Sequence, residues 1–294
     1  AGSCPRRARR SGASPMAPLS PLAGLARRSR CCRILLRSLS LALITTFVLT
    51  LVICKAVYDN DTDAWPDQGL QPISTYLMGQ WPGQTANLAI SRTGFALVVA
   101  QALVLGVFRL ALLLQVPHIK STRIYSMLVL LSALSGAGAL GTLLGVAIVT
   151  IEDNSSLHDG FACATYVMLP LAQVLELSVF VLFVPVHHEW RRRAVVCAVW
   201  AAVAVTATIA LMSAYVAEWR AGTLSDDKAA LQWSGAILGI SYYLIDPLAY
   251  VSILVNAADL SERPVRATAD REAAPSPDSA AVPLWRLACR HRGR

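Results

Sequence analysis

Residues 124–151 read IYSMLVLLSALSGAGALGTLLGVAIVTI, with no charged side chain in the whole stretch. The hydrocarbon layer of a bilayer is about 30 Å thick, and a helix needs about 20 apolar residues to cross it. The stretch is therefore long enough to span a membrane. Its continuous apolar character favours a helix over the alternating pattern of a membrane β-strand.

Five further blocks share this character, and they are Ile34–Val57, Thr93–Gln115, Gly160–Val186, Val195–Ala217 and Trp233–Val255. Hydrophobic residues make up 55% of the chain and charged residues 15%, whereas soluble domains average about 25% charged residues. We therefore predict an all-α polytopic integral membrane protein. Its transmembrane domain, residues 34–256, is expected to be a bundle of six helices.

The charged residues alternate between the two sides of these blocks. The net charge of +8 comes mainly from eight arginines before Ile34 and seven after Asp259, with further basic residues in 116–123 and 187–193. The other three connections are mostly acidic. Basic residues mark cytosolic segments, so both termini are predicted to be cytosolic. Because the basic residues lie where topology requires them, the net positive charge does not indicate binding to nucleic acid. Anionic lipid headgroups are the expected partners of the two tails.

The segments outside the bundle have distinct compositions. Residues 1–33 and 257–294 are rich in Arg, Pro, Ala and Ser, which predicts disordered cytosolic tails. Met16 is a candidate native start. Residues 58–92 form the one long connection, and its tryptophans and prolines predict a structured exoplasmic cap.

Two kinds of modification site stand out. Cys31 and Cys32 adjoin arginines at the cytosolic end of the first block, a position suited to S-palmitoylation, although two small residues at a helix end would look the same. Asn60 begins an Asn-x-Thr sequon in the predicted exoplasmic loop, which makes it a candidate glycosylation site.

Small residues line one face of the third block. Ala137, Gly141 and Gly145 recur at a spacing of four, which in membrane helices lets a neighbouring helix approach closely. Packing explains this pattern fully.

The order of several short motifs resembles that of the FRAG/DRAM/SFK family of six-span membrane proteins, including the N-terminal domain of Cwh-type proteins. The matching features are Pro72-Ile73-Ser74, the glycine- and serine-rich segment 131–151, the acidic turn with His158, and Glu218-Trp219. In the sixth block, Gly239-Ile240-Ser241-Tyr242 departs from the family's acidic–aromatic pattern, and this leaves the branch open.

The resemblance implies a DRAM-like, non-catalytic membrane protein that binds, senses or organises lipids in membrane homeostasis or autophagy. It would lie in the plasma membrane or the endomembrane system, either Golgi or endolysosome. The alternative is a component or enzyme of GPI-anchor lipid remodelling. Because G-x-S-x-G, Walker and Rossmann motifs are absent from the sequence, enzymatic activity is not favoured and no cofactor is expected.

Three ionisable residues lie within the apolar blocks, where a charge is costly and therefore points to a function. Arg109, Glu176 and Asp246 fall at similar depth on helices that run in the same direction. They could form a structural polar clamp, with Arg109 alternatively reaching the surface, or a site for a lipid headgroup or a proton. Gln173 could join them. Asp246-Pro247 also predicts a kink in the sixth helix.

A second group of polar residues is expected at the exoplasmic mouth, formed by Glu152, Asp153, His158, Asp159 and Glu218. His158 and Glu218 are the lipid- or proton-site candidates there. Histidine and carboxylates can bind metal, but no typical metal-binding spacing occurs in the sequence, so no metal is predicted. On the other side, His187 and His188 are interpreted as an interfacial anchor.

Overall fold

The computed structural model describes residues 30–61, 73–77, 85–116, 122–221, 226–262 and 282–283. Met16 and the rest of the basic segment up to Ser29 lie outside the described residues, as does most of the C-terminal tail.

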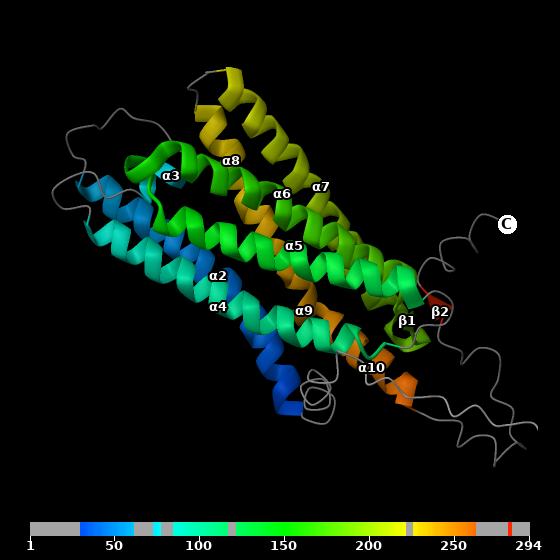
Figure 1. The fold of residues 1–294 in the computed structure, drawn as a ribbon. Helices are drawn as coiled ribbons and strands as arrows, with labels where there is room; N and C mark the ends of the chain where they lie inside the picture. Colours follow the sequence, from blue (N-terminus) through cyan, green and yellow to red (C-terminus); the bar gives the residue numbers. More distant parts are fainter. Residues whose placement is uncertain are drawn as a thin grey trace, which may run out of the picture.

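Long helices dominate the described residues (Figure 1). Five of them are long and apolar enough to cross a membrane: α2 (Arg30–Asp61), α4 (Thr85–Leu113), α5 (Thr122–Ile148), α6 (Ile151–Phe183) and α7 (Arg191–Ala221). The last hydrophobic block is broken into α8 (Asp226–Ser241), η3 (Tyr242–Leu244), α9 (Ile245–Leu248) and α10 (Tyr250–Glu262). It makes a sixth span if the bent pair crosses as one. The prediction of an all-α polytopic membrane protein is confirmed.

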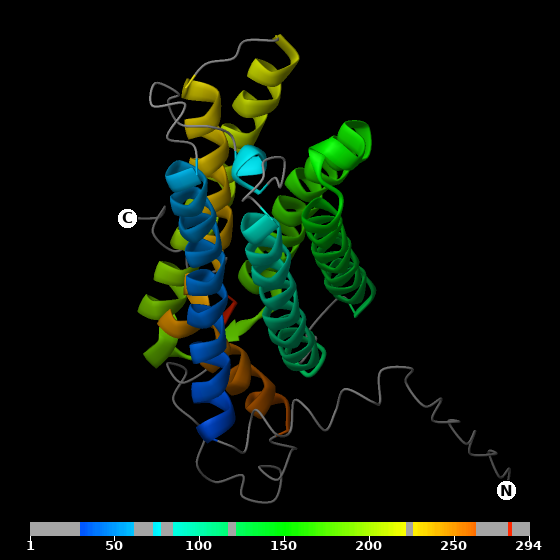
Figure 2. The same ribbon diagram turned by 90° about the vertical axis from the view of Figure 1, so that its left-hand side faces the viewer.

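The helices pack in a closed ring. Each of α2, α4, α5, α6, α7 and α8 contacts the next in this order, and α8 and α9 return to α2. Figure 2 shows α4 between α2 on one side and the α5–α6 pair on the other. All six helices line a central apolar cavity of about 90 Å³, with side chains that include Leu43, Val98, Leu140, Leu169, Met212 and Ile240.

The connection between α5 and α6 differs from the prediction. We expected the acidic segment 152–159 to be a loop, but α6 already begins at Ile151. The Thr150 hydroxyl accepts a hydrogen bond from the Asp153 backbone N–H, and the Asp153 carboxylate accepts one from the Thr150 N–H, both at 3.2 Å. This capping box satisfies free N–H groups at the helix start. This first turn is separated from the rest of α6 by a break at Asn154, whose φ and ψ angles are −164° and 95°. The Asn154 Oδ1 accepts a hydrogen bond from the Leu157 N–H at 3.0 Å where the helix resumes.

The predicted kink in the sixth block is present. The axis bends by 53° between Lys228–Leu248 and Tyr250–Ala257. Pro247 lacks a backbone N–H and so weakens the helix at this point. Trp200 of α7 donates to the carbonyl of Ser241 at 3.0 Å, which holds the broken region against its neighbour.

The predicted small-residue face of α5 packs closely at Gly145 but not at Gly141. A side chain at Gly141 would meet no atom within 4 Å, so no described helix approaches there. The close approach to α6 occurs instead at Gly145, where a Cβ would lie 2.7 Å from the Phe161 ring, and at Gly138 beside Met168. The spacing of the small residues therefore predicted that α5 packs closely against a neighbour, but not which of its glycines make the contacts.

Part of the predicted exoplasmic cap is described as the short helix α3 (Ile73–Tyr76). The Ile73 N–H donates to the Gln232 side chain of α8 at 2.7 Å. The Tyr76 ring lies between Tyr58 of α2 and Trp233 of α8, with centroid distances of 5.0 and 5.8 Å. These contacts hold the connection against α2 and α8, where the ring of helices closes.

The C-terminal segment is more ordered than predicted. The helix α10 continues to Glu262, beyond the expected boundary at residue 256. Val282–Pro283 forms β2, which pairs antiparallel with β1 (Pro185–Val186) beside the 3-10 turn η2 (His188–Trp190). The expectation of a disordered tail is therefore wrong at these two places.

Candidate functional site: a buried ion triad and its pocket

The structure brings the three intramembrane charges together. Arg109 of α4 donates to Asp246 of α9 through Nε and Nη2, at 3.1 and 2.7 Å. Its Nη1 donates to both carboxylate oxygens of Glu176 on α6, at 3.0 and 2.9 Å. Arg109 is only 5% exposed, so it does not reach the membrane surface as an isolated side chain. We call these three residues the ion triad.

Hydroxyl and aromatic groups complete the surroundings of the triad. Tyr242 and Tyr250 donate to Glu176 at 3.2 and 2.9 Å, and Ser40 of α2 donates to Asp246 at 2.6 Å. The Arg109 guanidinium carbon also lies 5.0 Å from the ring centres of Tyr243 and Tyr250, within the range of cation–π attraction. Helices from most of the ring therefore meet at this point.

The triad has an unequal charge balance. It combines one positive guanidinium with two carboxylates, so its formal charge is −1 when all three groups are ionised. The hydrogen bonds to the two acids involve all three nitrogens of the guanidinium, with Nη1 shared between the two oxygens of Glu176. A phosphate would therefore have to displace a carboxylate from Arg109 before it could bind there in the same manner.

The triad lies closer to one end of the bundle than we predicted. Arg109 is one turn before the end of α4 at Leu113, and Glu176 is two turns before the end of α6 at Phe183. The prediction of equal depth is confirmed by the contacts themselves. α4 and α6 begin eight and nine residues before the predicted hydrophobic blocks, so the triad lies nearer to one end of these helices than to their middle.

A pocket of about 250 Å³ adjoins the triad between α4, α5 and α6. Arg109, Glu176 and Gln173 lie in its wall. The lining also contains Leu103 and Gly106 of α4, which are exposed on the outer surface of the bundle. This lateral pocket therefore connects a buried polar cluster with the surface that faces the membrane.

Gln173 has a different role from the one expected. Its Nε2 donates to the Gly239 carbonyl of α8 at 2.9 Å, and no hydrogen bond joins it to the triad. Its Oε1 is buried and has no hydrogen-bond partner among the described residues. Gln173 therefore joins α6 to α8, and other atoms of this residue line the lateral pocket.

The structure gives different surroundings to the described residues among those predicted at the exoplasmic mouth. Asp153 caps α6, and the Glu152 side chain lies outside the described residues. His158 is 3% exposed, and its Nδ1 is 2.7 Å from the Val149 carbonyl at the end of α5. Because a carbonyl only accepts, Nδ1–H is the donor. Asp159 and Glu218 are half-buried. A structural role explains His158 directly.

We expect His158→Ala to destabilise the protein by about 1–3 kcal/mol, because it removes a buried imidazole and leaves the Val149 carbonyl without its donor. Thermal unfolding in detergent measures this loss. His158→Asn, which keeps a nitrogen donor, should recover part of it, and Ser156→Ala at an exposed position should change little. Normal stability combined with lost function in His158→Ala would instead support a ligand-binding role.

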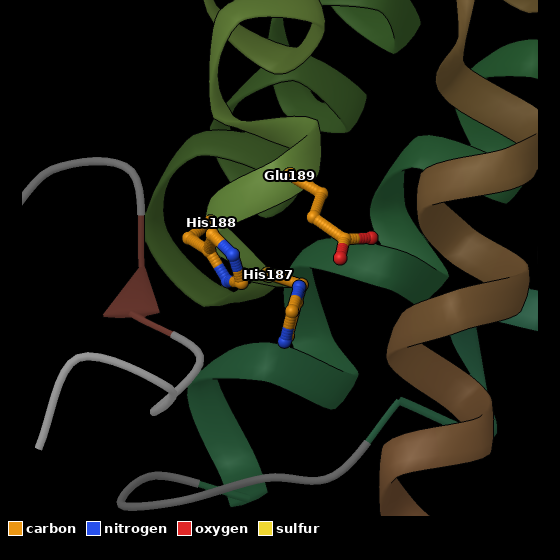
Figure 3. Close-up of side chains that lie close together, drawn as sticks. All are labelled: His187, His188 and Glu189. Atoms are coloured by element: carbon orange, nitrogen blue, oxygen red, sulfur yellow. The ribbon is translucent and has the colours of Figure 1, made fainter. Parts of the chain in front are cut away.

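His187, His188 and Glu189 form a group with metal-binding side chains at the turn between α6 and α7 (Figure 3). Their potential ligand atoms lie within 4.8 Å of one another. The three residues are consecutive in the sequence, and Arg191, Arg192 and Arg193 follow after Trp190. This positive charge opposes cation binding, so the group is a weaker candidate than the ion triad.

The candidate modification sites are only partly described. Cys31 is exposed at the start of α2 whereas Cys32 is buried, so of the two only Cys31 presents an accessible thiol. Asn60 belongs to the last turn of α2, but its side chain lies outside the described residues.

No protein family, curated protein or solved structure matches this chain. The geometry of the ion triad and the lateral pocket is therefore the basis for assigning a function.

Proposed function

We propose that this chain is a six-span membrane protein, with both termini in the cytosol, that binds a membrane lipid in the lateral pocket without catalysis. The observation that carries the proposal is the pocket itself. It joins a buried polar cluster to membrane-facing positions on α4. A lipid needs this combination, since its head is polar and its chains are apolar.

The depth of the ion triad supports this proposal. α4 has 29 residues, and at a rise of 1.5 Å per residue it is about 44 Å long. If α4 is centred on a hydrocarbon layer of about 30 Å, each end extends about 7 Å beyond it. Arg109, one turn from the end, then lies at the boundary between hydrocarbon and headgroups. This is the depth at which a lipid head resides.

The proposal includes membership of the FRAG/DRAM/SFK family, which the sequence resembles, and a location in the plasma membrane or the endomembrane system. Among the described residues, Arg109 and Glu176 line the pocket and form an ion pair with each other. Because these two charged groups are already paired, the pocket suits binding or sensing of a lipid better than its chemical remodelling.

Filling the pocket tests the proposal. A Cβ at Gly106 would meet no atom within 4 Å, so the larger side chain of Gly106→Leu starts from open space and should reduce the room in the pocket. In cells fed a fatty acid with a photoactivatable diazirine, which enters many lipid classes, we expect this variant to lose most cross-links between lipid and α4 or α5.

Gly141→Leu is the matched control, because Gly141 is also exposed with no atom within 4 Å but lies outside the pocket wall. It should cross-link like the unmodified protein. Equal cross-linking of both variants and the unmodified protein at α4 and α5 would overturn the proposed lipid site.

A further inference from the structure

The lateral pocket and the central apolar cavity follow one another along the bundle. On α4 the lateral pocket is lined from Leu113 back to Ala102, and the central cavity continues from Ala102 to Val98. The same succession holds on α5 and α6, where Leu140 and Leu169 line both spaces. The two spaces therefore adjoin at the level of these shared residues.

The wall of the central cavity suits a hydrocarbon group. The hydroxyls of Thr165 and Thr208 each donate to a carbonyl of their own helix, at 2.9 and 2.7 Å. The Tyr166 hydroxyl accepts a hydrogen bond from Gln232 at 2.8 Å. Water needs several polar partners to occupy a cavity, and these groups are already engaged. An empty space of about 90 Å³ deprives its wall of van der Waals contacts, which an apolar group would restore.

The length of one lipid chain matches the distance between the two spaces. Ala102 precedes Arg109 by seven residues and Val98 by eleven, which places them about 10 and 16 Å from it along α4 at 1.5 Å per residue. One leaflet takes half of the hydrocarbon layer of about 30 Å, so its chains reach about 15 Å. A chain that starts beside Arg109 and follows the lateral pocket therefore ends in the central cavity.

We infer that the lateral pocket leads the acyl chain of its bound lipid into the central cavity, so that the end of the chain lies inside the bundle. This inference rests on the proposed function and adds the ligand class, a lipid whose chain is as long as one leaflet. A shorter chain leaves the central cavity empty, and the contacts of its wall are then not restored.

Two photoactivatable fatty acids, fed to cells that make the full-length protein, test the inference. The first carries its diazirine at the far end of the chain, and the second carries it beside the carboxyl group. The cross-linked residues are identified by mass spectrometry. We expect the first to label Met212 and Ile240, which line only the central cavity and are 5% and 8% exposed. The second should label Val107 of the lateral pocket and neither of these two.

Two residues serve as references for variants. Ala139 is 3% exposed and lines the central cavity but not the lateral pocket. Ala139→Leu should therefore lose the labelling of Met212 and Ile240 by the first probe and keep that of Val107 by the second. Gly141→Leu, at an exposed position of the same helix outside both spaces, should be labelled like the unmodified protein.

The inference is overturned if the first probe labels Val203, which is 55% exposed on α7, but neither Met212 nor Ile240. This comparison uses the unmodified protein, so it decides even where Ala139→Leu does not fold. Undiminished labelling of Met212 in a folded Ala139→Leu also overturns the inference. The proposed function survives both outcomes as long as Gly106→Leu loses the cross-links of the second probe at α4 and α5, so the two failures are distinguishable.

Discussion

The double variant Glu176→Gln/Asp246→Asn is expected to lose about 3–5 kcal/mol more stability than the two single variants together. Each single change leaves Arg109 paired with the other carboxylate and removes the surplus negative charge of the triad. The double change leaves a buried guanidinium without a counter-charge, which is the costly case for a buried pair. Arginine cannot escape by losing its proton.

Unfolding of the two single variants and the double variant in detergent gives the coupling free energy directly. We expect each single variant to cost about 1 kcal/mol, the scale of a lost hydrogen bond. The exposed pair Lys55–Asp59 on α2 provides the control. Lys55→Met and Asp59→Asn should combine nearly additively, because exposed pairs contribute less than about 1 kcal/mol. Simple addition at the triad as well would show that the acids do not share Arg109.

The sequence allowed the triad to be predicted because depth in a membrane follows from helix direction and residue count. Each residue adds 1.5 Å along the axis, so Arg109, Glu176 and Asp246 could be placed at one level before any contact was known. The positions of these residues relative to the helix ends were predicted less accurately. Hydropathy locates the apolar stretch but not the polar first turns of a helix, and α4 and α6 both begin with such turns.

The rotation of each helix about its axis could not be predicted in the same way. It decides that Gly145 and not Gly141 meets α6, and that Gln173 bonds Gly239 and not the triad. The tyrosines of the broken sixth helix were missed for the same reason. Their only signal was proximity to Asp246 in the sequence, and the break at Ala249 lets Tyr242 and Tyr250 both reach Glu176.

Arg109→Lys is expected to cost about 3 kcal/mol although it preserves the charge. The guanidinium binds Asp246 with one edge, through Nε and Nη2, and Glu176 with Nη1. A lysine ammonium is a single point charge and cannot reproduce this fork. We expect it to stay with one carboxylate and lose about two charge-assisted hydrogen bonds, each contributing about 1.5–3 kcal/mol, with part recovered when the abandoned acid takes up a proton.

A second substitution in the lysine background identifies the abandoned acid. Neutralising that acid, by Glu176→Gln or Asp246→Asn, should cost almost nothing further. Neutralising the retained partner should cost more, because the lysine must then move to the other carboxylate or lose its proton. Arg92→Lys is the matched control, since Arg92 is exposed and donates a single hydrogen bond to the Ile148 carbonyl, and it should shift stability by less than about 0.5 kcal/mol. If Arg109→Lys is equally mild, the fork geometry is unimportant and charge alone holds α4, α6 and α9 together.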